Sequence, residues 1–418
     1  MNWRRFCIFA AAPAVYYFSS NKSGISDQPN HERSFNAKKL AAEKAIKRYM
    51  LLNGVPGVSV GVSIDGKTVW RSGVGFSDVE QCVPCTGDTV MRIASISKSM
   101  TAVITAQLVE NEKLDVDAPV QNYVPSFPVK KFDNEEVKIT CRQLLTHTSG
   151  IRHYKSTNDS KTEENLKEFY ANEQFDNVLD SLKMFQDDDL LCKPGSKYIY
   201  TTFGYTLLSA ALEKASGKKF ETLLMDLTGK LGMNNTRLDK NPDIVPNRAR
   251  YYKFNGSNKL ENTPEVNCSY KWGSGGILSN VADLLIFGNS LLYSYQYQPS
   301  STASPKPLLK SKTMKKLWSG GVPSEAVSNE EYYWGWFGRP KIERLGGGAP
   351  NRTGVYFHTG AAVGASSILL IRPTCQTLVE NQPTGTCVAI LANMESAGRI
   401  AQLAFEISEI FSDDLKKP

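Results

Sequence analysis

Residues 57–70 read GVSVGVSIDGKTVW, and the conformation of this stretch decides between three kinds of fold. Residues 57–61 match G-x-S-x-G, the sharp turn that presents the nucleophile in many α/β-hydrolases. Residues 61–68 match G-x-x-x-x-G-K-[ST], the phosphate-binding P-loop. Both patterns need a helix to begin at a defined point after a strand, so the local conformation tests them.

The pattern of apolar residues in this stretch is that of a strand. Val58, Val60 and Val62 alternate with small residues, which is the period-two spacing of a half-buried strand. Asp65-Gly66 is a strong hairpin-turn signal, and apolar residues resume directly after it. Both motifs require a helix at a point where these residues predict a strand, so both matches are interpreted as accidental. The stretch therefore predicts a β-hairpin.

The composition of the whole chain is that of a globular protein. The chain has 418 residues, of which 41% are hydrophobic and 22% charged, with a formal net charge of +7. Basic and acidic residues are interleaved, without the basic blocks and aromatic stripes of nucleic-acid-binding proteins, so no nucleic-acid partner is expected. Eight cysteines are too few for a disulfide framework at this length, and the lone C-x-x-C at residues 82–85 lacks the second pair of a zinc site.

The first 34 residues predict a targeting leader. Arg4 and Arg5 precede an apolar run over residues 6–18, and the first acidic residue is Asp27. The run is shorter than the ~20 residues of a membrane span. It fits a secretory signal or a mitochondrial targeting segment, and composition alone does not separate the two. We therefore predict one domain over residues 35–418.

Strand patterns at both ends of that domain enclose a helical middle. Helical periodicity is expected at 36–53, and again through much of residues 91–330, including a long helix over 164–185. Strands return as VYFHTG, SSILLIRP and CVAILAN, and a last helix carries Ile400, Leu403, Ile407 and Phe411 on one face. This order predicts an α+β fold, with an antiparallel sheet built from about 35–90 and 331–418 and a helical lobe over about 91–330.

Ser95-Ile96-Ser97-Lys98 is an S-x-x-K at the start of an amphipathic helix. Three residues are close to one helical turn, so the Ser95 hydroxyl and the Lys98 amine share a face. A serine needs a base beside it, and a lysine can serve if burial or a nearby cation lowers its pKa. The alternative is a serine cap followed by a solvent-facing lysine.

Two further motifs follow in order, Tyr200-Thr201-Thr202 before a helix and His358-Thr359-Gly360 on a late strand. The set resembles that of serine β-lactamases and penicillin-recognising enzymes: S-x-x-K, then Y-x-N or S-x-N, then K-T-G. Together with LLTHTSGIRHY, MRIASISKSMTAV, SYKWGSGGILS and HTGAAVGASSILL, it is similar to the mitochondrial serine β-lactamase-like proteins of animals, within the class C β-lactamase and DD-carboxypeptidase group. The similarity runs from about residue 36 to the C-terminus.

This resemblance implies a role for each matching residue. Ser95 would be the acyl-accepting nucleophile, Lys98 its general base, and Tyr200 a proton shuttle. The backbone N–H groups of Ser95 and Ala361 would form the oxyanion hole, next to Thr359 and Gly360 of the third motif. No metal or other cofactor is implied.

Two positions depart from the family pattern. Thr202 stands where the family has asparagine, which removes an amide that holds substrate. His358 stands where the family has lysine, so a fixed positive charge becomes conditional on pH. We expect a slow amidase or peptidase whose substrate anchoring through His358 improves at mildly acid pH. The alternative for His358 is a strand histidine bonded to a neighbour.

His147 and His153 are interpreted as structural residues, because no acidic metal partner lies at a recognised spacing.

The resemblance also implies partners and a location. It implies a peptide or acyl-amide substrate, assembly into homo-oligomers or filaments, association with the mitochondrial inner membrane, and an influence on lipid metabolism. It favours the mitochondrion, in the intermembrane space, over secretion. Two alternatives stay open: a filament-forming scaffold with little turnover, and an esterase that uses the same serine.

Overall fold

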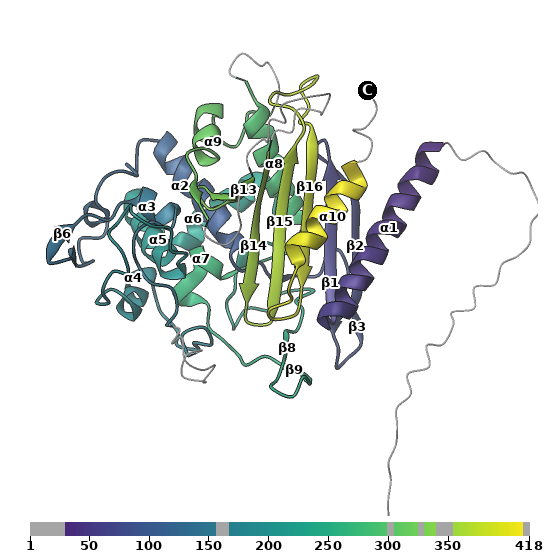
Figure 1. The fold of residues 1–418 in the computed structure, drawn as a ribbon, viewed down its shortest axis with the longest axis horizontal. Helices are drawn as coiled ribbons and strands as arrows, with labels where there is room; N and C mark the ends of the chain where they lie inside the picture. The colour runs from purple at the N-terminus through teal and green to yellow at the C-terminus, as the bar shows by residue number, and fades with distance from the viewer. Residues whose placement is uncertain (1–29, 156–166, 299–304, 325–329, 340–353, 413–418) are drawn as a thin grey trace, which may run out of the picture.

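The structure is a computed structural model that describes residues 30–155, 167–298, 305–324, 330–339 and 354–412. Within them the largest element is a nine-stranded sheet in which all neighbouring strands are antiparallel (Figure 1). In spatial order its strands are β11 (Val322–Pro323), β12 (Glu331–Tyr332), β13 (Phe337–Arg339), β14 (Val355–Ala362), β15 (Ala365–Pro373), β16 (Gly385–Ala392), β1 (Gly57–Ile64), β2 (Lys67–Asp78) and β3 (Val83–Pro84).

The predicted hairpin is confirmed and joins the two ends of the chain. β1 pairs with β2 through a turn at Asp65 and Gly66, whose φ angles of 50° and 78° suit a tight hairpin. On its other edge β1 pairs with β16, with Val60 opposite Ile390. Because β1 continues into a second strand, neither a P-loop nor a nucleophile elbow is present at residues 57–70.

Helices cover both faces of this sheet. The helices α1 (Asn30–Asn53) and α10 (Ile400–Ser412) lie together on one face, as the purple and yellow helices of Figure 1 show. The predicted apolar face of the last helix is buried there: Ile400, Leu403, Ile407 and Phe411. On the other face α8 (Val281–Gln296) packs so closely on β1 that a Cβ at Gly61 would lie 2.9 Å from a Leu285 methyl group.

The remaining elements form the mostly helical part of the chain. Its helices are α2 (Ile96–Glu110), α3 (Cys141–Leu145), α4 (Val178–Ser181), α5 (Thr202–Ser216), α6 (Phe220–Leu231), α7 (Trp272–Gly275) and α9 (Ser311–Leu317), with 3₁₀ turns η1 (Val120–Asn122), η3 (Leu182–Met184) and η4 (Ser269–Lys271). Short strands accompany them: β4 (Met91–Arg92), β10 (Ile277–Ser279) and β7 (Arg237–Leu238) in one sheet, β5 (Lys130–Phe132) with β6 (Glu135–Val137), and β8 (Tyr252–Phe254) with β9 (Leu260–Asn262). The fold is α+β, as the sequence predicts.

The long helix predicted over residues 164–185 is wrong in the part that the structure describes. Only α4 and η3 are helical there. The apolar residues serve two separate clusters: Phe169 packs with residues of the 266–272 region, whereas Val178 and Leu182 enter the main core. Asn177 caps α4 by accepting from the Asp180 amide, so the helix begins well after Phe169.

Some predictions fall outside the described residues. Residues 1–29 of the predicted leader lie outside them, and its last five residues belong to α1, which begins at Asn30. No helix among the described residues is both long and apolar enough to cross a membrane.

Candidate active site

Ser95 stands at the start of α2, directly after a backbone in an unusual conformation. Ala94 has φ +48°, a left-handed value that costs a residue with a Cβ about 1 kcal/mol or more. The amides of Ile96, Ser97 and Lys98 bond to the carbonyls of the three residues from Ile93 to Ser95. The Ser95 amide has no acceptor among the described residues. The first turn of α2 therefore offers a free backbone donor beside the Ser95 hydroxyl.

Lys98 is fully buried and its amine faces Ser95. Its Nζ lies 3.1 Å from Ser95 Oγ and 2.6 Å from the carbonyl oxygen of Ser274, at α7. Burial lowers the pKa of Lys98 well below its usual range, and the positive charge of nearby Lys271 lowers it further. The lowered pKa makes the amine a better proton acceptor than an exposed lysine. Its full burial excludes the alternative of a solvent-facing lysine.

Tyr200 contacts the same serine, and its ring lies 4.9 Å from the Lys98 amine, measured to the ring centroid. Its hydroxyl donates to Ser95 Oγ at 2.7 Å. Desolvation raises the pKa of Tyr200, against a smaller lowering effect of the Ser95 bond. The phenol therefore stays protonated when the Lys98 amine is neutral. A lysine of lowered pKa and a tyrosine of raised pKa thus contact the same serine hydroxyl, which is the pairing that a general base and a general acid require.

Two histidines hold the segment that carries Tyr200. His147 Nδ1 accepts from the Thr201 amide at 3.1 Å, and His153 Nδ1 accepts from the Thr202 amide at 3.2 Å. Desolvation is the main cause that lowers the pKa of His147 far below 6.5 and that of His153 to about 3, so both rings are neutral acceptors. Among the described residues no group of three or more His, Cys, Asp or Glu side chains could hold a metal ion. The structure gives both histidines a backbone-holding role.

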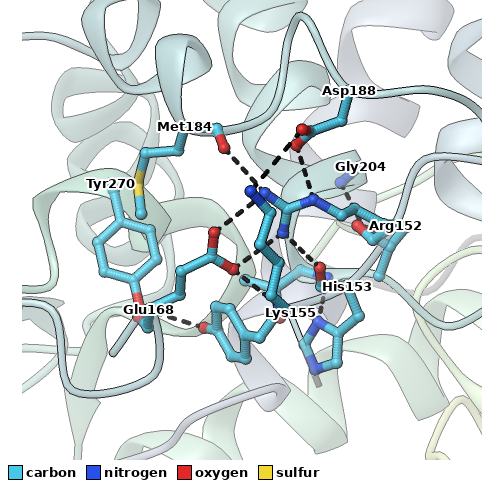
Figure 2. Close-up of polar contacts among 11 residues, drawn as sticks. Arg152, His153, Lys155, Glu168, Met184, Asp188, Gly204 and Tyr270 are labelled. Atoms are coloured by element: carbon cyan, nitrogen blue, oxygen red, sulfur yellow. Dashed lines mark hydrogen bonds and ion pairs between the residues drawn. The ribbon is translucent and has the colours of Figure 1, made fainter. Parts of the chain in front are cut away.

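An ion-pair network fixes the loop that carries His153 (Figure 2). The guanidinium of Arg152 pairs with Glu168 at 2.9 Å and with Asp188 at 2.7 Å, and it donates to the Met184 carbonyl. The Arg152 carbonyl accepts from the Thr201 hydroxyl at 2.6 Å. The loop is thereby tied to the segment next to Tyr200.

The third motif lies on β14, against the residues before Ser95. A Cβ at Gly360 would lie 2.5 Å from the Ile93 carbonyl oxygen and 2.8 Å from the Ala94 Cβ, so only glycine permits this approach. Ala361 follows and is exposed. The strand therefore runs beside the first turn of α2, with Ala361 on the open side.

A buried ion cluster supports this junction and was missed from the sequence. Arg92 pairs with Asp239 at 2.7 Å, and Arg248 pairs with the other carboxylate oxygen at 2.5 Å. Arg92 also donates to the Val363 carbonyl, just past β14. No spacing in the sequence links these residues, because they lie on four separate segments.

The structure contradicts the expected pH switch at His358. Its side chain is 1% exposed; Nδ1 contacts the Thr359 carbonyl at 2.6 Å and Nε2 contacts the Tyr332 hydroxyl at 3.0 Å. Burial, with the Lys98 charge, lowers the pKa of His358 to about 3. The ring is neutral above pH 5 and carries no charge for a substrate. His358 is the alternative expected from the sequence, a strand histidine bonded to its neighbours.

Thr202 occupies the position of the family asparagine as the first residue of α5. It is buried, and its backbone N–H donates a hydrogen bond to His153.

The role of Ser274 was also missed: its segment matched a family signature, but the sequence did not show that its carbonyl oxygen would accept a hydrogen bond from the Lys98 amine.

Comparisons with known proteins agree with this geometry. A β-lactamase family profile matches residues 42–406. The chain is 39% identical to the human serine beta-lactamase-like protein LACTB, mitochondrial, over 86% of this chain and 77% of that protein. It is 25% identical to a teichoic acid D-alanine hydrolase of Staphylococcus aureus, over 80% of this chain and 74% of that protein. Among solved structures, the octameric penicillin-binding protein homologue of Pyrococcus abyssi superposes with a TM-score of 0.70 at 24% identity, over 90% of this chain and 77% of that one. The chain belongs to the β-lactamase family and has its serine hydrolase fold.

Proposed function

We propose that the protein hydrolyses peptide or small acyl-amide bonds through an acyl-enzyme on Ser95. One observation carries this proposal: Ser95 Oγ lies between a lysine amine of lowered pKa, 3.1 Å away, and a protonated tyrosine hydroxyl, 2.7 Å away. Such a serine has both a base to activate it and a donor to protonate the leaving group.

Acylation follows from these contacts. The neutral Lys98 amine takes the Ser95 proton as Oγ attacks the substrate carbonyl. The negative charge that develops on the carbonyl oxygen would be stabilised by the Ser95 and Ala361 amides, at the junction of α2 and β14. The free Ser95 amide supports its part in this oxyanion hole.

Collapse of the tetrahedral intermediate requires a proton for the leaving nitrogen. Tyr200 would deliver it and recover one from Lys98, which returns the lysine to its neutral form. A water molecule then attacks the acyl-enzyme by the same proton transfers in reverse. A dedicated donor favours an amide over an ester substrate, since an amine must be protonated to leave.

The test is intact mass spectrometry of the chain after exposure to a fluorophosphonate, with peptide mapping of the adduct. A single adduct on Ser95, absent from Ser95→Ala and strongly slowed in Lys98→Met, is expected. No adduct on the folded protein between pH 5.5 and 8.5 would refute the hydrolase and favour the scaffold. Matched ester and amide substrates then separate the esterase from the amidase.

We also propose a mitochondrial location, in the intermembrane space, and assembly into homo-oligomers that form filaments, contact the inner membrane and influence lipid metabolism. The mitochondrial name of the 39% identical relative supports the location, and the octameric neighbour supports self-association. Imaging a C-terminally tagged chain, with and without residues 1–34, tests the location against secretion. Sedimentation and electron microscopy of Ser95→Ala protein test whether assembly is independent of turnover.

A further inference from the structure

Lys271 is a buried lysine that neither the three motifs nor the mechanism uses. It ends η4 and its side chain is almost fully enclosed, with 4% of the residue exposed. Its ammonium lies over aromatic rings, 5.1 Å from the centroid of Tyr270, 5.6 Å from Phe169 and 6.0 Å from Tyr154.

Within the described part of the chain this ammonium has no carboxylate partner and donates no hydrogen bond. Two acidic groups of the described residues in this region are already paired: the half-buried Glu168 with Arg152, and the buried Asp239 with Arg92 and Arg248. Taking a cation out of water without a counter-ion is unfavourable, and cation–π contacts offset only part of that cost. A lysine in this state is suited to a counter-ion that arrives with a ligand.

Lys271 belongs to the machinery around Ser95 by its position. Three residues later in the same segment, the Ser274 carbonyl holds the Lys98 amine at 2.6 Å. The Lys271 ammonium lies over the ring of Tyr154, which stacks on the His153 ring with 4.3 Å between the two centroids. His153 in turn accepts a hydrogen bond from the Thr202 amide. The positive charge of Lys271 acts on Lys98.

Along β14, as far as the structure describes this side of the site, no Lys or Arg side chain competes with Lys271. His358, at the position of the family lysine, is neutral and has both ring nitrogens engaged. Lys98 must itself be neutral to act as the base. We propose that Lys271 is the anion-recognising residue of the Ser95 site and that it binds a carboxylate of the substrate. This assignment rests on the proposed acyl transfer and names a substrate class for it: acyl-amides that carry a carboxylate.

The test measures binding on the full chain with Ser95→Ala, so that it does not depend on turnover. The probes are N-acetylalanine and its neutral isostere N-acetylalaninamide, titrated by calorimetry or ligand-observed NMR. We expect the carboxylate to bind about 10-fold more tightly than the amide, as charge-assisted hydrogen bonds do. Lys271→Met should bring this ratio close to one, and Lys271→Arg should retain most of it.

Lys240→Met is the matched control. Lys240 also lies over an aromatic ring, that of Trp272 at 5.9 Å, but it is paired with Glu221 at 2.6 Å. The Lys240→Met variant should still bind N-acetylalanine more tightly than N-acetylalaninamide. The assignment would be overturned if Lys271→Met kept this difference in affinity, or if the chain with Lys271 intact bound both probes equally. Unfolding temperatures confirm that each variant is folded.

A second readout separates this inference from the proposed function. N-acetylalanine should slow fluorophosphonate labelling of Ser95 in the wild-type chain and lose that effect in Lys271→Met. If Ser95 never labels, the hydrolase proposal fails while the binding ratio still tests Lys271. If Ser95 labels but N-acetylalanine never protects it, Lys271 does not serve the Ser95 site.

Discussion

The two sides of Ser95 differ in how well they match the family motifs and in what they supply chemically. The strand side, β14, carries the third motif and the glycine that lets it approach Ala94, but its His358 is neutral and bonded to Tyr332. The helical side supplies Lys98 and Tyr200, which we propose as base and proton donor, and the buried Lys271. A motif thus predicts where a backbone runs, whereas charge depends on burial and partners from distant segments.

The largest expected effect of a substitution on the helical side belongs to Lys98. Lys98→Met keeps the volume of the side chain and removes the base, so Ser95 labelling and turnover should fall on the order of 10³–10⁴-fold. The labelling rate by mass spectrometry measures this. Lys113→Met, on the exposed turn after α2, is the control and should behave as wild type. A loss below about 10-fold would mean that another group activates Ser95.

Tyr200→Phe should give the next largest loss, on the same side. Without the hydroxyl the leaving nitrogen lacks its proton donor, so amide turnover should fall about 10²-fold, and turnover of an ester with a good leaving group much less. Steady-state kinetics on a matched ester and amide pair measures the difference. Tyr198→Phe is the control, because Tyr198 makes no hydrogen bond to Ser95. Equal losses on both substrates would contradict the donor role.

The sequence predicted the arrangement of Ser95 and Lys98 because one helical turn fixes their spacing. It predicted the hairpin and the last helix for the same reason, since period two and period 3.6 are local properties. It failed at residues 164–185, where apolar spacing resembled a helix although Phe169 and Val178 enter different clusters. It also failed for the charge of His358, because Tyr332 and the enclosing core come from elsewhere in the chain.

Lys271 illustrates the same limit from the other direction. Its position in SYKWGSGG gives no sign of an unpaired cation. That property appears only once Tyr154, Phe169 and Tyr270 surround it and the nearby carboxylates are paired elsewhere. Charge balance in a core is a tertiary property, and no local pattern encodes it.

Acid stability should reveal the neutral histidines on both sides of the site. The pKa of His358 and of His153 is about 3 in the folded protein, against about 6.5 when unfolded, so the unfolded state binds more protons as the pH falls below 6.5. The part of the unfolding free energy that depends on these neutral rings is therefore fully present above pH 6.5. It is lost as the pH falls toward 3, with a slope approaching about 1.4 kcal/mol per pH unit for each histidine. Urea unfolding at pH 7, 6 and 5 measures this loss.

The comparison with His358→Gln isolates one histidine from the carboxylates, which also titrate toward the lower end of this range. The variant should lose less stability than the wild-type chain between pH 7 and 5, by roughly 2 kcal/mol, because 1.5 pH units below 6.5 lie in that interval. Parallel curves for the two proteins would show that the pKa of His358 is the same in the folded and the unfolded chain, which would restore a cation to the strand side below about pH 6.5.

The smallest expected effect is that of His358 on the rate, and it sharpens the contrast between the two sides most directly. If the strand side supplies shape and not charge, His358→Gln should change kcat/KM by about 3-fold or less at every pH from 5.5 to 8, because a ring with a pKa near 3 does not titrate there. The pH dependence that remains should belong to Lys98: activity falls with acidity as the amine becomes protonated, in wild type and variant alike. An activity that rises between pH 8 and 5.5 in the wild type and is flat in the variant would show a histidinium that anchors substrate. That result would move the anion site from η4 to β14 and leave Lys271 only its effect on the pKa of Lys98.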